Sequence, residues 1–195
     1  MSKLEKRREE LEKARKKYEE WGNRVRELEK KYKEEEKTTK AEEKTTAAKA
    51  DLVDESLLKR IYAQMTFLNK TAAHVMRKYE VHSCTDVTGF SLLGHSFEMA
   101  QGSECTIHIQ TDQIPYHAEA LELAAMGLIP AGAYRNREYA EADVLVCGDI
   151  PLAMQDILYD PQTSGGLLIA LPKKEAEDCL AKIKEKIPQA AIIGY

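Results

Sequence analysis

The chain has 195 residues with a formal net charge of −4, and hydrophobic residues make up 43% of it. Residues 1–46 carry 16 of the 29 basic and 13 of the 33 acidic side chains, so residues 47–195 hold 13 basic and 20 acidic ones. A segment so rich in both signs of charge cannot bury enough apolar surface to fold as a globule, and we therefore place the globular domain at residues 47–195. The acidic balance of this domain argues against a nucleic-acid partner, which would require a basic surface.

The cysteines and the hydropathy exclude further classes of protein. The four cysteines are widely spaced and contain no Cys-X-X-Cys pair, so they do not form a zinc-binding pattern. Apolar neighbours of Cys147 and Cys179 predict buried free thiols in a reducing compartment. We expect no signal peptide and no membrane span, because no apolar stretch approaches the roughly 20 residues that a span needs. We expect a soluble, cytoplasmic protein with no membrane partner.

Residues 4–32 place apolar side chains at alternating steps of three and four, the heptad pattern of a coiled coil. The pattern predicts a long N-terminal helix, followed by a polar joint at residues 37–49. This helix could pair with a copy of itself, pack on the domain or stand alone. We favour the first two, and therefore expect a homo-oligomer.

From Asp51 onward, helical and strand patterns alternate. A first helical pattern extends to Tyr79 and predicts that Tyr62, Met65, Phe67 and Met76 belong to the core. Further helices are predicted at 89–101, 117–126, 151–158 and 173–187, strands at 81–87, 104–110, 143–147, 167–171 and 190–194, and loops at 127–142 and 160–166. This order predicts an α+β fold with a mixed sheet covered by helices.

The string CTDVTGFSLLGH (residues 84–95) brings a carboxylate to the end of a predicted strand, directly before a helix. A helix N-terminus attracts anions. Asp86 at such a place suits a phosphate bridged by Mg²⁺, a hard cation that prefers oxygen ligands. The alternative is that Asp86 or Thr88 only caps the helix.

The string LYDPQTSGGLLIA (residues 158–170) places two glycines between hydroxyl residues and an apolar strand. Glycines allow the backbone to approach a ligand or another strand closely. The string is not a P-loop, because no Gly-Lys-Ser/Thr follows. The alternative is a tight turn before a strand.

Together, the two strings closely resemble the two signatures of the C-terminal domain of selenophosphate synthetases (selenide, water dikinases), in the superfamily of aminoimidazole ribonucleotide synthetase. The resemblance covers roughly residues 46–195, including MTFLNKTAAHVM and GAYRNREY. It implies transfer of phosphate from ATP to selenide, giving selenophosphate, AMP and phosphate, with Mg²⁺ and in a homodimer. It further implies a metal-binding role for Asp86. The residues that the resemblance assigns to the cofactor site are Thr85, Thr88, Gly89, Thr163, Ser164, Gly165 and Gly166.

The chain departs from this family before residue 47. The family has an N-terminal domain with a catalytic Cys or selenocysteine and a Lys, whereas residues 1–46 contain neither Cys nor Asp. We therefore expect the chain to be inactive without the missing N-terminal domain, whose place a natural or engineered helix takes. The alternative is a non-catalytic folded scaffold whose N-terminal helix drives self-association or partner docking.

Several side chains receive a more ordinary interpretation. Ser91 stands where the family usually has Gly. We expect His95 to pack on its helix, with a catalytic role as the alternative, and Cys84 to belong to the core. Arg135, Asn136 and Arg137 are expected in a solvated loop, with contact to a phosphate or sulfate as the alternative.

Overall fold

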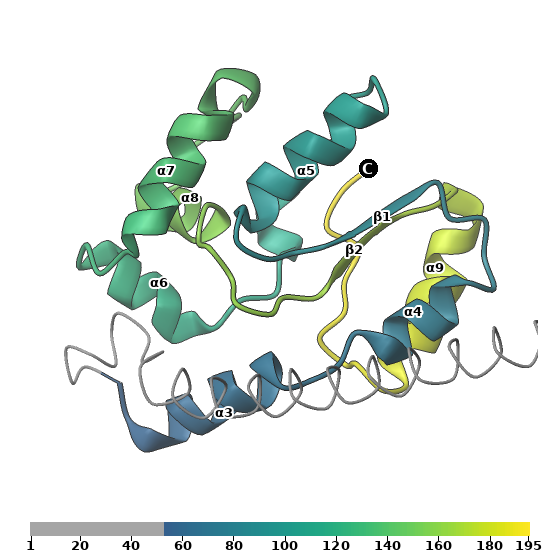
Figure 1. The fold of residues 1–195 in the computed structure, drawn as a ribbon, viewed down its shortest axis with the longest axis horizontal. Coiled ribbons are helices and arrows are strands. Elements are labelled where there is room, and N and C mark those ends of the chain that lie inside the picture. Colours follow the sequence, from purple (N-terminus) through teal and green to yellow (C-terminus); the bar gives the residue numbers. More distant parts are fainter. Residues whose placement is uncertain (1–52) are drawn as a thin grey trace, which may run out of the picture. The chain divides into compact units, whose positions relative to one another are not determined.

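The computed structural model describes residues 53–195, and its elements are shown in Figure 1. The predicted heptad helix, the polar joint and the scaffold alternative that depends on them lie outside the described residues. The helices of the described part are α3 (Glu55–Met65), α4 (Lys70–Met76), α5 (Ser91–Gly102), α6 (Ala118–Ala125), α7 (Ala131–Ala140), α8 (Leu152–Leu158) and α9 (Lys173–Lys184), with 3-10 turns η1 (Thr111–Gln113) and η2 (Glu141–Asp143). The strands are β1 (Ser83–Asp86) and β2 (Leu167–Ala170). This combination of helices with a small sheet confirms the predicted α+β class.

The first helical pattern of the domain forms two helices instead of one. Asp54 caps α3, because its carboxylate accepts a hydrogen bond from the Leu57 amide at 2.7 Å. Helix α3 ends where the Thr66 hydroxyl donates to the Tyr62 carbonyl at 2.8 Å, a bond that competes with the continuing helix. The prediction that Tyr62 and Phe67 belong to the core is wrong, since their side chains are 40% and 46% exposed.

The two strands pair antiparallel, with Ser83 opposite Ala170 and Asp86 opposite Leu167. Backbone bonds extend the pairing at both ends, from His82 N to Ala170 O (2.8 Å) and from Val87 N to Gly166 O (2.9 Å). Exposure alternates along β1, so this strand is half-buried and not fully buried as predicted. In the described part of the chain the sheet has two antiparallel strands, and the prediction of a mixed sheet is wrong.

The strands predicted at 104–110, 143–147 and 190–194 do not form as strands. Their pairing is limited to one antiparallel bridge between Ile109 and Gly194. The amide of His108 donates to the Tyr195 carbonyl at 2.7 Å beside this bridge, and the two aromatic rings stack. Segment 143–147 has the side chains of a strand but no ladder partner among the described residues. A strand needs a neighbouring backbone as well as suitable side chains, and the side-chain pattern reports only the second condition.

The main core lies between α5, α7 and α8. Helix α5 contacts β1 and also packs on α7, while α4 contacts both β2 and α9. Figure 1 shows α5 and the α4–α9 pair on opposite sides of the two strands. The core residues are Val87, Leu92, Leu93, Ala133, Ala140, Met154, Leu158 and Tyr159.

Helix α7 occupies a region that was predicted to be a loop. Its buried positions are Ala133, Asn136 and Ala140, and small or polar side chains at these positions do not produce an apolar helical pattern. Small residues permit close packing instead. A Cβ atom at Gly132 would lie 2.7 Å from Cγ of Pro161, so α7 sits directly against the second signature string.

The thiol predictions are partly confirmed. Cys179 is buried on α9, as expected, whereas Cys84 and Cys147 are exposed, which corrects both predictions of burial. None of the helices described between residues 53 and 195 combines the length and apolarity needed to cross a membrane.

Candidate functional site

The two signature strings are hydrogen-bonded to each other. The Gly165 amide donates to the Val87 carbonyl and the Val87 amide donates to Gly166, both at 2.9 Å. The Gln162 amide donates to the Thr88 carbonyl at 3.1 Å. These bonds continue the β1–β2 pairing beyond its last strand residues. Two segments about 75 residues apart in the sequence therefore form a single structural unit.

Gly165 is buried where the backbones of the two signature strings approach each other most closely. A Cβ atom at position 165 would lie 2.2 Å from the Val87 carbonyl oxygen and 2.7 Å from Oε1 of Gln162. Gly166 differs, because a Cβ atom there would meet nothing within 4 Å. The Gly-Gly pair predicts a close approach of two backbones. Gly165 is the glycine that makes this approach.

Two asparagines from other elements hold carbonyl groups of the unit. Asn136 on α7 donates through Nδ2 to the carbonyls of Gly89 (2.9 Å) and Tyr159 (3.0 Å), and so contacts both strings. Asn69, between α3 and α4, donates to the Gly165 carbonyl at 3.0 Å. The interpretation of Asn136 as a solvated loop residue is wrong, because it is buried on a helix. In the sequence, Asn136 was marked only by belonging to the string GAYRNREY, and this string did not reveal which groups its side chain contacts.

Arg137 is also held within the structure. Its guanidinium forms an ion pair with Asp156 of α8 at 2.7 Å and lies over the Tyr159 ring, 4.7 Å from the centroid. Both partners of the ion pair are largely shielded from solvent. Arg137 thus ties α7 to α8, and of the three residues predicted to be solvated, Arg135 alone is exposed.

The entry into α5 has an uncommon backbone. Ser91, which is fully buried, has a φ of 72°, in the left-handed region that favours glycine. Its Oγ accepts a hydrogen bond from the Gly94 amide at 3.3 Å. The alternative that Asp86 or Thr88 caps this helix is wrong, because no side-chain cap bond is made at the residue before Ser91.

Thr88 takes part in a chain of side chains instead. Its hydroxyl lies 3.1 Å from Nε2 of His95, and Nδ1 of His95 lies 3.0 Å from a carboxylate oxygen of Glu98. Because a carboxylate accepts and does not donate, the neutral imidazole carries its proton on Nδ1. In this neutral form Nε2 accepts the Thr88 proton, which leaves the Thr88 oxygen as an acceptor. His95 therefore orients Thr88 in addition to packing on its helix.

The two aspartates of the strings differ in their surroundings. Asp86 is exposed at the end of β1, on the same strand face as Cys84. Although the Cys84 side chain is exposed, partial desolvation by its neighbours, with the Asp86 charge as a second cause, raises the pKa of its thiol, so this cysteine is not an activated nucleophile. Burial alone raises the pKa of Asp160 to about 6. No local pattern singles out Asp160, because its burial depends on the tertiary structure.

The remaining residues assigned by the resemblance lie on or beside the unit. Thr85, Thr88 and Ser164 are half-buried, whereas Gly89, Thr163 and Gly166 are exposed. Within residues 53–195 no cluster of three or more His, Cys, Asp or Glu side chains could hold a metal by itself. Asp86 is therefore a candidate for one ligand position and not for a complete metal site.

Comparison with known proteins identifies the family of this chain. The family described as "AIR synthase related protein, C-terminal domain" matches residues 25–195. The chain is 50% identical to the selenide, water dikinase of Clostridium botulinum (strain Eklund 17B / Type B) over 147 residues, which is 75% of this chain and 43% of that protein. It is 47% identical to that of Clostridioides difficile (strain 630) over 147 residues, 75% of this chain and 42% of the relative.

A third match has the same extent. The selenide, water dikinase of Treponema denticola is 45% identical over 143 residues, 73% of this chain and 39% of the relative. The chain thus spans less than half the length of the relatives it matches. It belongs to the family of AIR synthase related proteins through their C-terminal domain, with selenide, water dikinases as its relatives.

Proposed function

We propose that residues 47–195 form the C-terminal half of a selenide, water dikinase, which contributes to the cleft for Mg·ATP. The reaction converts ATP, selenide and water into selenophosphate, AMP and phosphate. The proposal rests on one observation above all. The two signature strings are joined by backbone hydrogen bonds at Val87, Thr88 and Gly165, and this unit leaves the Asp86 carboxylate exposed at its edge.

The donor set fits a shared magnesium site. Mg²⁺ is commonly held by one or two carboxylates together with substrate phosphates, and Asp86 can supply one carboxylate. When bound, Mg²⁺ would offset the negative charge of the polyphosphate. With a neutral His95, the Thr88 hydroxyl donates to Nε2, and its oxygen then suits a cation, a bound water or an N–H group better than a bare phosphate oxygen.

The rigid surroundings support a binding role for this unit. Asn69 and Asn136 hold three of its carbonyl groups, which fixes the loops before any ligand arrives. A preorganised loop loses less conformational freedom on binding than a mobile one. We further propose that the chain lacks activity by itself, since a single carboxylate and an unactivated Cys84 do not supply the nucleophile and ligands of phosphoryl transfer.

The test is a calorimetric titration of the full chain with Mg·ADP and Mg·ATP. Asp86→Asn should weaken binding about tenfold or more, because an interaction with a charged group contributes about 1.5–3 kcal/mol. Asp112→Asn, which removes the same charge from an exposed position on η1, is the matched control. Equal affinity of the wild type and Asp86→Asn would contradict the assigned site.

The claim of incompleteness has a separate test. Selenide-dependent release of AMP should be absent with the chain alone. It should appear when the N-terminal portion of a selenide, water dikinase is supplied as a second polypeptide. Turnover by the chain alone would refute the claim of incompleteness, and continued inactivity of the mixture would refute the assignment to this reaction.

A further inference from the structure

A buried histidine on α5 connects the signature unit with solvent. Nε2 of His95 lies 3.1 Å from the Thr88 hydroxyl, and Nδ1 lies 3.0 Å from a carboxylate oxygen of Glu98, one turn later on the same helix. The imidazole side chain is 11% exposed, whereas the side chain of Glu98 is 42% exposed. Thr88, within the first signature string, is half-buried. The three side chains therefore form a continuous chain of contacts from the unit to the protein surface.

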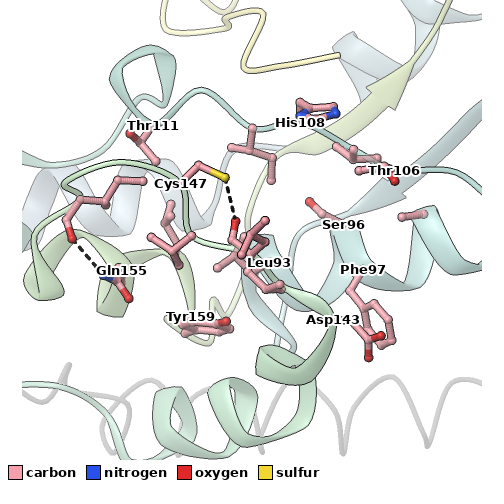
Figure 2. A pocket seen from close by; sticks show the side chains of 18 of the residues that line it. Leu93, Ser96, Phe97, Thr106, His108, Thr111, Asp143, Cys147, Gln155 and Tyr159 are labelled. Carbon is pink, nitrogen blue, oxygen red and sulfur yellow. Dashed lines mark hydrogen bonds between the residues drawn. The ribbon is translucent and has the colours of Figure 1, made fainter.

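The surroundings of the imidazole favour proton movement along this chain of contacts. The ring of Phe90 packs edge-on against the imidazole, with the two centroids 5.7 Å apart. The next residue, Ser96, lines the pocket shown in Figure 2, but His95 is not among its lining residues. Both ring nitrogens are engaged, one with Thr88 and the other with Glu98. A proton that reaches the imidazole from Thr88 is therefore best passed on to Glu98.

A hydroxyl, an imidazole and a carboxylate in this order are suited to moving a proton. A neutral imidazole accepts a proton on one nitrogen and can release the proton of the other nitrogen. A carboxylate beside the second nitrogen holds the ring in the required tautomer and stabilises the imidazolium while it exists. A hydroxyl group and a base in hydrogen-bond contact, with the base oriented by a third group, are typical of nucleophile activation.

We propose that Thr88, His95 and Glu98 form a proton path for the water-consuming step of the dikinase reaction. A water molecule bonded to Thr88 Oγ1 attacks a phosphoryl group. An O–P bond forms, and the bond to the leaving oxygen breaks with its electron pair on that oxygen. The water proton passes to Thr88 Oγ1, the Thr88 proton passes to Nε2 of His95, and the Nδ1 proton passes to Glu98 and then to solvent.

This inference rests on the proposed function, because the path needs a reaction that releases a proton. Thr88 contacts the reacting water and is the catalytic residue of the path. His95 and Glu98 act through Thr88 and are positioning residues. The path adds to the proposed function a role for side chains that contact neither the metal nor the nucleotide.

NMR of the full chain with ¹⁵N-labelled histidine tests the path without any enzymatic activity. The neutral imidazole of His95 should carry its proton on Nδ1, with Nε2 unprotonated. Thr88→Val should shift the Nε2 resonance because it removes the hydroxyl, and the exposed Glu122→Gln variant on α6 should not. A neutral His95 protonated on Nε2 would overturn the proposal, since it could not accept the Thr88 proton.

The function of the path is tested in the mixture of the full chain with the N-terminal portion of a selenide, water dikinase. His95→Gln should lower kcat for AMP release about 100-fold, the lower end of the usual contribution of acid–base catalysis. Its affinity for Mg·ADP should stay unchanged, because glutamine can still accept the Thr88 hydrogen bond but cannot pass a proton on. Glu98→Gln should lower kcat less, since His95 could still release its proton to water.

Two exposed positions provide matched controls. His74→Gln on α4 and Glu122→Gln on α6 make the same chemical changes outside the path and should leave kcat unchanged. A His95→Gln variant with the kcat of the wild type would refute the path and leave the dikinase assignment standing. An inactive wild-type mixture would refute that assignment, and the path with it.

Discussion

Gly165 and Val87 approach so closely that the amide of one donates to the carbonyl of the other at 2.9 Å, with no room for a side chain between them. A methyl group at position 165 would lie 2.2 Å from that carbonyl oxygen. The distance between the two signature strings is therefore set by the absence of a Cβ atom at one residue.

Replacing Gly165 with Ala should force the two strings apart. We expect a loss of about 1–3 kcal/mol in the free energy of unfolding, the usual cost of overpacking a tight contact, and weaker Mg·ADP binding. Gly166→Ala is the matched control, since nothing lies within 4 Å of its added Cβ. Urea unfolding of both variants gives the comparison. Equal losses at the two positions would show that the Gly165 contact does not govern the unit.

Replacing Asn136 with Asp keeps the shape of the side chain but removes both hydrogens that Nδ2 donates. The carbonyls of Gly89 and Tyr159 would then face a carboxylate, and we expect a loss of at least about 1–3 kcal/mol per unpaired buried group. Arg135→Ala, at the exposed neighbouring position, should change stability by less than about 0.5 kcal/mol. Thermal unfolding measures both, and a stable Asn136→Asp variant would show that the two bonds contribute little.

Ser91 combines a strained backbone with a useful hydroxyl. Glycine removes the left-handed strain of about 1–2 kcal/mol but loses the bond to the Gly94 amide and gains freedom in the unfolded chain, at about 0.4–1 kcal/mol. Alanine keeps the strain and loses the bond. Because the gain and the two losses of the glycine variant are of similar size, Ser91→Gly should lie close to the wild type, and Ser91→Ala should be the least stable of the three. Denaturant midpoints test this order, and an alanine variant above the wild type would contradict it.

Asp160 should make stability depend on pH. Burial raises its pKa in the folded state to about 6, above its ordinary value of 3.8. The folded state then holds the proton more tightly than the unfolded chain, so the contribution is complete below about pH 4 and is lost as the pH rises through about 6. Relative to Asp160→Asn, the wild type should lose about 2 kcal/mol between these limits. Asp149→Asn, at an exposed position, is the control that should leave the profile unchanged. A parallel pH profile for the wild type and Asp160→Asn would contradict the burial argument.

Local patterns in the sequence predicted the helices well where each carried its own signal. Helix α8 follows Pro151 and α6 is followed by Gly127 at a φ of 78°, both as expected from the residues at their ends. Helix α7 was missed because its buried face consists of Ala133, Asn136 and Ala140, which are too small or too polar to resemble an apolar stripe. The strands at 143–147 and 190–194 were predicted from side chains alone. In the described part, segment 143–147 has no backbone partner, and segment 190–194 pairs only through the single bridge to Ile109.

The sequence by itself identified the two signature strings and the family that they resemble, because each string is a contiguous run of residue types. Only the tertiary structure decided how these strings meet, which carbonyls Asn69 and Asn136 hold, and that the Thr88 hydroxyl lies beside His95. The physical reason is the sequence distance between the residues that interact. Propensity and periodicity arise from neighbours within a few residues, whereas burial, close backbone contact and hydrogen-bond partners depend on residues brought together from distant parts of the chain.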